Sequence, residues 1–309
     1  MSQVGMMAGA GELPEIIARR AYAEGSPVPT VALSAHVAAQ LTPYCPTLVQ
    51  YGPGQLTKII RAFQRYKVQQ VVMVGKVEKR LLFENPRLDL RGLRRLSRMR
   101  DYRDVTLLHA IVAEFAEEGL EVIEQTRLLG HLVTPEGVLG KRCPSLRAWD
   151  DIRYGFARAK QLAALDIGQT IVVRRQTVLA VEALEGTDAT ITRGCQYGGR
   201  GAVAVKVSRP QQDMRFDVPT VGPHTLQQAV AGRAAVLAVE AGTTLMLRLP
   251  ELVAMADARR IALVGVSSAA LQPSPSPCGR GALGHRSSIA PFPPAEERGD
   301  GASEGEEKD

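Results

Sequence analysis

The sequence predicts an α/β protein with two folded domains and a C-terminal tail that lies outside them. At 309 residues, the chain is long enough to bury two separate hydrophobic cores. Short apolar runs typical of strands alternate with longer helix-like segments through most of the chain, which favours mostly parallel sheets covered by helices. From residue 269 the composition changes, and Pro, Ser, Gly and acidic residues dominate.

The first domain is expected to cover residues 1–131. Its pattern predicts strands at 4–8, 28–33, 70–74 and 121–123, and helices at 14–24, 56–66 and 105–118. Pro14 suits the start of its helix because the fixed φ and missing N–H of proline are tolerated there. Pro135, Gly137 and Gly140 then interrupt the alternation, and the boundary between the domains is placed beside them.

The second domain is expected to cover residues 132–268. Its pattern predicts helices at 149–164, 225–231 and 250–259, and strands at 202–207 and 261–266. Two strand pairs, 170–174 with 177–181 and 235–239 with 244–247, are predicted to be hairpins because a short turn separates the members of each pair. The tail 269–309 is predicted to be disordered, since it cannot bury enough apolar area to offset the entropy of ordering.

Composition and charge narrow the functional classes. The net charge is +6, and the tail 269–309 contributes −3 through four Lys or Arg and seven Asp or Glu, so the first 268 residues hold +9. A basic body suits anionic partners such as phosphorylated metabolites or membrane surfaces. Aromatic residues make up 5% of the chain, which argues against a base-stacking platform, and no nucleic-acid partner is expected.

The cysteines and the N-terminus indicate a cytoplasmic protein. Cys45, Cys143, Cys195 and Cys278 form no C-x-x-C pair, so neither a zinc knuckle nor a disulfide framework is indicated. No signal-peptide pattern follows Met1, and no apolar run approaches the roughly 20 residues that span a bilayer. We expect a cytoplasmic location, with contact to the inner leaflet of the membrane left open.

Acidic side chains follow the apolar run 202–207 in a segment that ends regular structure. Asp213, Arg215 and Asp217 precede Pro219, which removes a backbone donor and fixes φ. Carboxylates held where a strand gives way to a loop suit a hard cation such as Mg²⁺, which takes oxygen ligands and often bridges to substrate phosphates. The alternative is a strand end whose acids are simply solvated.

A second acidic window comes directly after the predicted strand 177–181. Three acids fall within seven residues there, and the last two are Glu185 and Asp188. Lys206, on another predicted strand, would supply a cation beside them. The structural alternative is that Thr187 or Asp188 caps the next short helix.

The first domain offers phosphate contacts at two strand ends. Gly11 lies in a turn between a strand and a helix, where backbone N–H groups and the helix N-terminus suit a phosphate. Lys76 follows a predicted parallel strand, at the edge where ligands of open α/β sheets gather. A plain structural turn and a solvated lysine are the alternatives. A dinucleotide fingerprint would need glycine in place of Pro14 and an acid in place of Leu33-Ser34, so a nucleotide-sugar or NAD-dependent oxidoreductase is the less favoured enzyme.

Two further segments indicate contacts with substrate or lipid. Gln169 precedes a predicted hairpin and carries a donor and an acceptor suited to a base or sugar hydroxyl, with ordinary turn chemistry as the alternative. Residues 76–103 hold ten Lys or Arg with leucines at helical spacing, which suits anionic lipid or an acyl chain. That stretch supports a third hypothesis, a non-enzymatic lipid or membrane-surface binding module, beside the more ordinary one of a solvated helix face.

Several of these segments occur together in the order found in one known family. The most specific are 185–188 (EGTD) and 215–222 (RFDVPTVG), and the others are 9–14, 75–77, 139–141, 166–169, 178–183 and 206–207. Together they resemble the LpxI-type UDP-2,3-diacylglucosamine pyrophosphatases of lipid A biosynthesis, over about residues 3–267. Two departures are Ala10, where family members often have glycine, and Lys79-Arg80, where an arginine-proline pair is common.

The resemblance implies a two-domain enzyme whose active site lies in the cleft between the domains. It implies magnesium-dependent hydrolysis of UDP-2,3-diacylglucosamine to UMP and 2,3-diacylglucosamine 1-phosphate (lipid X), with water attacking the sugar-side phosphorus. It also makes Asp217 the key catalytic aspartate.

Together with the residue patterns, the resemblance assigns a role to each candidate. Asp217 and Asp188 would hold the metal or orient the water, Glu185 would complete the catalytic acids, and Lys206 would steady the phosphate. Further candidates for substrate contact are Gly11, Lys76, Gln169 and Thr187. The sequence leaves open which carboxylate binds metal and which takes a proton, and whether the protein is a monomer or a homodimer.

Overall fold

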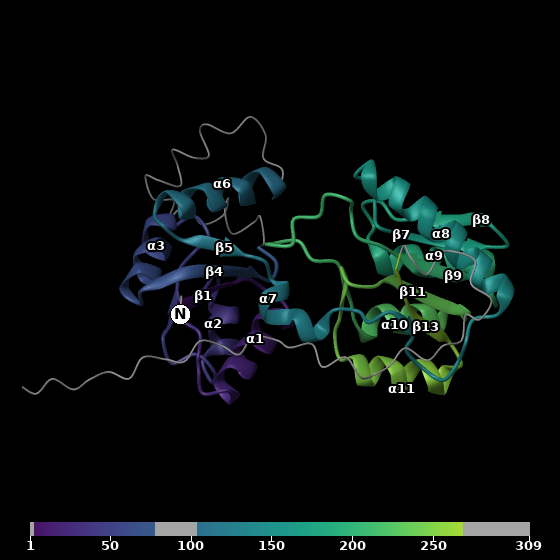
Figure 1. Ribbon diagram of the computed structural model, residues 1–309, viewed down its shortest axis with the longest axis horizontal. Coiled ribbons are helices and arrows are strands. Elements are labelled where there is room, and N and C mark those ends of the chain that lie inside the picture. Colours follow the sequence, from purple (N-terminus) through teal and green to yellow (C-terminus); the bar gives the residue numbers. More distant parts are fainter. Residues whose placement is uncertain (1–2, 78–103, 268–309) are drawn as a thin grey trace, which may run out of the picture. The chain divides into compact units, whose positions relative to one another are not determined.

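The structure, a computed structural model, describes residues 3–77 and 104–267, which form two compact units (Figure 1). The first unit contains the described residues up to Ile123, and the second starts at Glu124. Each unit has its own β-sheet with helices packed against it, so the expected α/β class is confirmed. The predicted tail 269–309 and nearly all of the basic stretch 76–103 lie outside the described residues. None of the described helices combines the length and the apolar character that crossing a bilayer requires.

Over the described residues, the first unit is a parallel sheet with the strand order β3-β2-β1-β4-β5. The strands are β1 Gln3–Ala8, β2 Thr30–Ala32, β3 Leu48–Gln50, β4 Val68–Val74 and β5 Glu121–Ile123. The helices are α1 Glu12–Ala23, α2 Ala35–Leu41, α3 Leu56–Arg65 and α6 Asp104–Glu117. The strand order reverses between β1 and β4, because the chain first adds strands on one side of β1 and then returns to its other side.

Apolar side chains of α3 and α6 form the core of this unit with the sheet. Ile59 and Phe63 are buried because α3 places its apolar residues three to four positions apart, on one side of the helix. Phe63 meets Phe115 of α6 edge to face, with ring centroids 6.1 Å apart. Gly5 of β1 leaves room for this ring, since a Cβ at that glycine would lie 2.8 Å from Phe63.

The second unit contains a mixed sheet with the strand order β6-β13-β11-β9-β7-β8. Its strands are β6 Gly137–Val138, β7 Thr170–Arg174, β8 Thr177–Val181, β9 Val203–Lys206, β11 Val236–Glu240 and β13 Ala262–Val266. A separate small sheet joins β10 Thr220–Val221 to β12 Leu245–Met246. The helices are α7 Thr126–Leu129, the short 3-10 helix Gly130–Leu132, α8 Leu146–Ala164, α9 Thr187–Gly198, α10 Pro223–Ala231 and α11 Leu249–Arg259.

Alternate side chains of the central strands divide the core of the second unit into two layers. Val203 and Val205 of β9 pack with apolar residues of α8 on one face of the sheet. Ala204 packs on the opposite face, in a cluster with apolar residues of α9, α10 and α11. Helix α9 lies close to the sheet because Gly194 carries no side chain, and a Cβ there would be 2.4 Å from Val172. The sheet is therefore covered by helices on both faces.

One of the two predicted hairpins is confirmed and the other is wrong. Strands β7 and β8 pair antiparallel, as the sequence predicts. By contrast, β11 pairs in parallel with β9 and β13, while Leu245-Met246 pairs with Thr220-Val221 in the small sheet. The run Val236–Val239 is buried on both faces of the sheet, as expected of a central parallel strand rather than one arm of a hairpin.

The sequence pattern does not predict α2, β3 or the full length of α9. Helix α2 and strand β3 are short, and the apolar pattern between residues 35 and 50 contains no extended period. Helix α9 covers twelve residues where a short helix is expected. Its N-cap is Gly186, with no side-chain cap hydrogen bond, so Thr187 and Asp188 are freed from the capping role considered for them.

Candidate active site

Lys206 is the point at which two polar segments of the second unit meet. It ends β9, is only 8% exposed, and donates from Nζ to the Thr187 hydroxyl at 2.9 Å and to the Thr220 carbonyl oxygen at 3.1 Å. Thr187 opens α9, and Thr220 follows Asp217 by three residues. A single buried ammonium group therefore joins the start of α9 to the segment that follows the predicted catalytic aspartate.

The Thr187 hydroxyl connects Lys206 to a carboxylate that the sequence analysis did not select. The Thr187 hydroxyl donates to Glu182 Oε1 at 2.9 Å, and Thr170 Oγ1 lies 3.2 Å from Thr187 Oγ1. The other carboxylate oxygen of Glu182 accepts the backbone N–H of Gln169 at 3.2 Å. Glu182 thereby places a negative charge one hydroxyl away from the buried Lys206, which lowers the cost of burying that cation.

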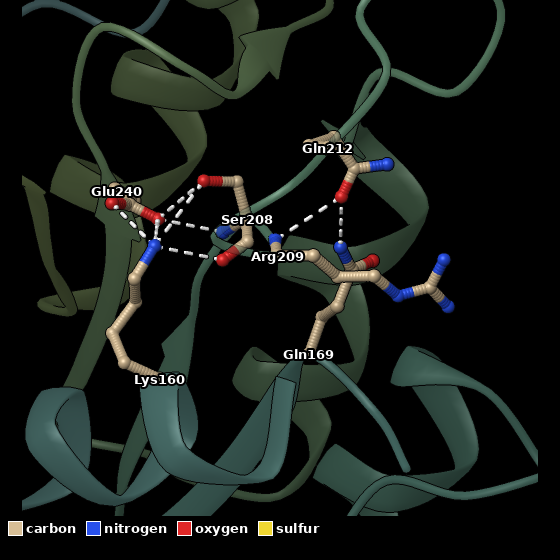
Figure 2. Close-up of polar contacts among 6 residues, drawn as sticks. All are labelled: Lys160, Gln169, Ser208, Arg209, Gln212 and Glu240. Carbon is tan, nitrogen blue, oxygen red and sulfur yellow. Dashed lines mark hydrogen bonds and ion pairs between the residues drawn. The ribbon is translucent and has the colours of Figure 1, made fainter. Parts of the chain in front are cut away.

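Asp217 is held by side chains from its own loop, one of which, Gln212, is itself held by Gln169. The Gln212 amide donates to the backbone oxygen of Asp217 at 2.7 Å and to its carboxylate Oδ2 at 2.5 Å. Arg209 Nη1 lies 3.4 Å from the same carboxylate oxygen. Gln169 Nε2 donates to Gln212 Oε1 at 2.7 Å, a contact drawn in Figure 2. The Asp217 side chain is 51% exposed, so its carboxylate is fixed in position yet open to a ligand.

An ion pair anchors the start of this loop (Figure 2). Lys160 of α8 donates to the Ser208 carbonyl oxygen at 2.8 Å and lies 3.0 Å from Glu240 Oε1 at the end of β11. Glu240 Oε2 accepts the backbone N–H of Ser208 at 2.6 Å and its hydroxyl at 2.8 Å. Side chains from two elements, α8 and β11, thus fix Ser208 two residues after the end of β9, and with it the direction in which the loop leaves the sheet.

Asp188 contacts a histidine from the neighbouring helix. Its Oδ2 lies 2.6 Å from Nδ1 of His224, the second residue of α10. Its Oδ1 is shielded from solvent and has no hydrogen-bond partner among the described residues. A shielded carboxylate oxygen without a donor is costly unless a cation or another donor reaches it. Asp188 stands out in the sequence, whereas no pattern in the sequence points to His224.

Glu185 has a local set of partners. Its carboxylate contacts Arg193 of α9, accepts the backbone N–H of Ala183 at 3.2 Å and lies 3.3 Å from the Thr190 hydroxyl. Hydrogen bonds from its own backbone N–H and from Arg193 hold the pKa of Glu185 below its ordinary value. In the described contacts, no hydrogen bond joins Glu185 to Asp188 or Asp217. These partners stabilise the turn that leads into α9.

The two candidates of the first unit lie together at one edge of its sheet. Ala10 and Lys76 exchange two backbone hydrogen bonds, at 2.9 and 2.8 Å, which join the turn after β1 to the end of β4. The approach is close because Gly75 adopts φ +89°, where a Cβ would lie 2.7 Å from Gly9. Gly11 and Lys76 are exposed there. Since the strand order reverses between β1 and β4, this edge is where open α/β sheets bind ligands.

The residues of the second unit fit a magnesium ion only if substrate oxygens complete its coordination. Within residues 3–77 and 104–267, no group of three or more His, Cys, Asp or Glu is placed to hold a metal. Mg²⁺ is commonly held by one or two carboxylates together with waters and substrate phosphates. The unpartnered oxygen of Asp188 and the exposed carboxylate of Asp217 are oxygen donors of this type.

Two α/β units with polar groups gathered at strand ends are typical of enzymes that bind their ligands at sheet edges. The LpxI N-terminal domain model matches residues 3–132, and the LpxI C-terminal domain model matches residues 135–264. The chain is 32% identical over 277 residues to the UDP-2,3-diacylglucosamine pyrophosphatase LpxI of Caulobacter vibrioides. The alignment covers 86% of this chain and 98% of that protein. The chain therefore belongs to the LpxI family, and it is an enzyme.

Proposed function

We propose that this protein hydrolyses the diphosphate bond of UDP-2,3-diacylglucosamine, with magnesium, to UMP and 2,3-diacylglucosamine 1-phosphate. The family membership and the activity in the name of the Caulobacter relative support this substrate. The proposal rests on one structural observation. Asp217, in the segment most specific to the family, has a half-exposed carboxylate held in place by Gln212 and Arg209. Water would attack the sugar-side phosphorus, so that the bridging oxygen leaves with UMP.

The polar groups of the second unit have complementary roles in this proposal. A magnesium ion, when bound, neutralises the charge of the diphosphate oxygens that would otherwise repel a nucleophile. Asp217 orients the attacking water or accepts its proton, since its carboxylate is fixed and accessible. Lys206 supplies a positive charge that the Thr187 hydroxyl links to Glu182. Asp188 offers its unpartnered oxygen to the cation.

The first unit would contribute phosphate or uridine contacts through Gly11 and Lys76. Both are exposed where β1 and β4 end, and Gly11 is the N-cap of α1. Gln169 and Thr187 would bind substrate from the second unit. An active site formed jointly by both units stays a prediction, as does contact of the acylated substrate with the inner leaflet of the membrane.

The residues at the end of β2 argue against the oxidoreductase alternative. A dinucleotide site places an acid there, to bind the ribose hydroxyls. Ser34 stands at this position and caps α2, accepting the backbone N–H of Val37 at 3.3 Å. Ser34 therefore serves to start a helix, and this position has no carboxylate that could bind a ribose.

Replacement of Asp217 by Asn tests the proposed function. Loss of the carboxylate should lower kcat for UMP release from UDP-2,3-diacylglucosamine by about 10³-fold, because proton transfer and metal binding both require it. The matched control is Asp213→Asn, which removes an acid of the same loop that pairs with Arg215. It should retain activity within about tenfold.

Two further measurements complete this test. A chelator should abolish UMP release by the unmodified enzyme, and added magnesium should restore it. Thermal melting should show that Asp217→Asn stays folded. A kcat for Asp217→Asn close to that of the unmodified enzyme would remove Asp217 from the mechanism, and undiminished activity in chelator would remove the metal.

A further inference from the structure

A basic cavity lies between helix α3 and the edge strand β3 of the first unit. Its volume is about 220 Å³. Lys58, Arg61 and Arg65 line it from α3, at spacings of three and four residues that place all three on one face of the helix. Tyr51 and Tyr66 line it from the segments that follow β3 and α3. The cavity therefore combines three cationic side chains with two phenol rings.

The positive charge of this cavity is not neutralised within the described part of the chain. Arg61 and Arg65 are exposed, and neither forms an ion pair with any described acidic residue. Lys58 is also exposed, and its Nζ lies 6.0 Å from the centre of the Tyr51 ring. Some surface arginines elsewhere in the molecule do have an acidic partner, for example Arg20 with Glu24 at 2.7 Å. Three cations left together without an acid favour an anionic ligand.

The floor of the cavity is apolar and belongs to the core of the unit. Ala62 is buried, and Val49, Tyr51 and Tyr66 pack partly buried against the hydrophobic cluster beneath. Because β3 is the edge strand, no further described strand covers this side of the sheet. The cationic groups thus surround a rigid apolar surface, on which a ring or a short alkyl segment can rest while its charged group is held above.

We propose that this cavity binds a phosphate ester through its phosphate group. Arginine guanidinium groups match phosphate oxygens in a bidentate geometry, and tyrosine hydroxyls donate to the same oxygens. At about 220 Å³ the cavity is smaller than typical sites for drug-sized ligands, so it suits a phosphate with one small ring or a lipid headgroup. It shares no residue with Gly11 or Lys76 and none with the second unit. The proposal is therefore independent of the catalytic site.

Binding measurements on the full chain test this proposal in two arms. The soluble arm titrates inorganic phosphate and glucose 1-phosphate while NMR follows the methyl groups of Val49 and Ala62. The lipid arm measures co-sedimentation with phosphatidylcholine vesicles that contain phosphatidylglycerol, against vesicles of phosphatidylcholine alone. We expect saturable binding with a Kd of about 1 mM or tighter in at least one arm, weakened by added salt.

The test variant is Arg61→Gln with Arg65→Gln, and the control is Arg147→Gln with Arg259→Gln, which changes the charge equally at exposed positions of the second unit. The test variant should weaken binding at least about tenfold, and the control should leave it within about twofold. Lys58→Gln provides a second, milder variant, and thermal melting confirms folding.

The outcomes separate the source of the phosphate from the existence of the site. If the test variant loses binding in the soluble arm, the cavity is assigned to a free phosphate ester. If it loses binding in the lipid arm alone, the cavity is assigned to a lipid headgroup. Equal binding by the test variant and the control overturns the proposal, as does absence of binding in both arms. UMP release by the test variant should stay at the level of the unmodified enzyme. Failure of the catalytic proposal would thus be seen separately.

Discussion

At the scale of single residues, the polar side chains of the second unit divide into those that stabilise it and those left for a ligand. Lys160 and Glu240 satisfy each other and the start of a loop. Lys206 is more buried than Lys160, and the Thr187 hydroxyl links its ammonium group to Glu182. Asp217 and the free oxygen of Asp188 remain accessible or unpaired. We therefore expect the first pair to stabilise the fold and the other groups to serve catalysis.

Replacing each of the two lysines by methionine should separate these roles. Lys206→Met should lower kcat by about 10²-fold or more, as removal of a fixed electrostatic group does, and change the unfolding free energy by about 1 kcal/mol. Lys160→Met should leave kcat within about tenfold but destabilise the fold by about 2–4 kcal/mol, because the Glu240 carboxylate loses its cation. Steady-state assays and chemical denaturation measure both. An equal loss of kcat in the two variants would show that Lys206 acts only through folding.

The lowered pKa of Glu185 leads to a prediction about the stability of the protein at acid pH. Its pKa is lowered in the folded state, so the unfolded chain binds its proton more readily. The stabilisation is therefore complete above the ordinary glutamate pKa and is lost as pH falls through the lower folded value. Glu185→Gln should flatten the acid limb of the stability curve below about pH 4, and Arg193→Gln should do so in part. Denaturation midpoints across pH measure this, and an unchanged slope in both variants would contradict it.

Glu185→Gln also tests the catalytic role expected for this residue from the sequence. A catalytic carboxylate requires kcat to fall at neutral pH in a variant that thermal melting shows to be folded there. If kcat is unchanged there, the contacts with Arg193 and Thr190 account for the residue fully, and Glu185 has a structural role.

At the scale of elements, the two predicted hairpins show what local pattern can decide. The turn between β7 and β8 contains Arg175 and Gln176, both with positive φ, at 51° and 54°. A two-residue loop of this kind matches the twist of an antiparallel pair. The buried Asp151 of α8 accepts both backbone N–H groups of the turn, at 3.0 and 2.6 Å. The pairing is local in sequence, and its support from Asp151 is not.

One set of substitutions at this turn should stabilise the protein, and another should destabilise it. Arg175→Asn with Gln176→Gly should stabilise the protein by about 1 kcal/mol, because these residues adopt left-handed backbone conformations at little steric cost. Asp151→Ala should destabilise it by about 2–4 kcal/mol, since two backbone N–H groups of the turn lose their buried, charged acceptor. Chemical denaturation measures both changes. A stability unaffected by Asp151→Ala would show that the turn needs no support from α8.

At the scale of the whole molecule, each unit has a hydrophobic core among its described residues. The buried apolar residues run from Val4 to Val266, and they include a cluster in the first unit and two clusters, on opposite faces of the sheet, in the second. The matched family domains end at residue 264. We therefore expect that the residues after 267 are not needed for either of these cores.

Truncation after residue 267 should leave both stability and activity unchanged. We expect the melting temperature to stay within about 2 °C, which corresponds to less than about 1 kcal/mol for a chain of this size, and the rate of UMP release to be preserved. Scanning calorimetry and the hydrolysis assay measure the two properties, with the full chain as the control. A clear drop in melting temperature would assign the removed segment a role in the fold.

Much of the candidate site could be selected from the sequence, but its connections could not. Gln169, Thr187 and Lys206 stand out by position at strand and helix ends, and the structure brings them into one network. Gln212 and His224 were missed because their roles depend on partners in space. Gln212 matters only because its amide reaches Asp217, and His224 only because α10 starts beside Asp188.

The sequence by itself determined the α/β class, the position of most strands and helices, and the family. These depend on local periodicity and on short motifs, both of which involve residues close together in the sequence. Only the tertiary structure decided that Val236–Glu240 pairs with Val203–Lys206 and Ala262–Val266 rather than with Leu245–Met246. The reason is that parallel pairing and side-chain contacts join segments tens of residues apart. Burial of both sheet faces selects between partners that look alike in the chain.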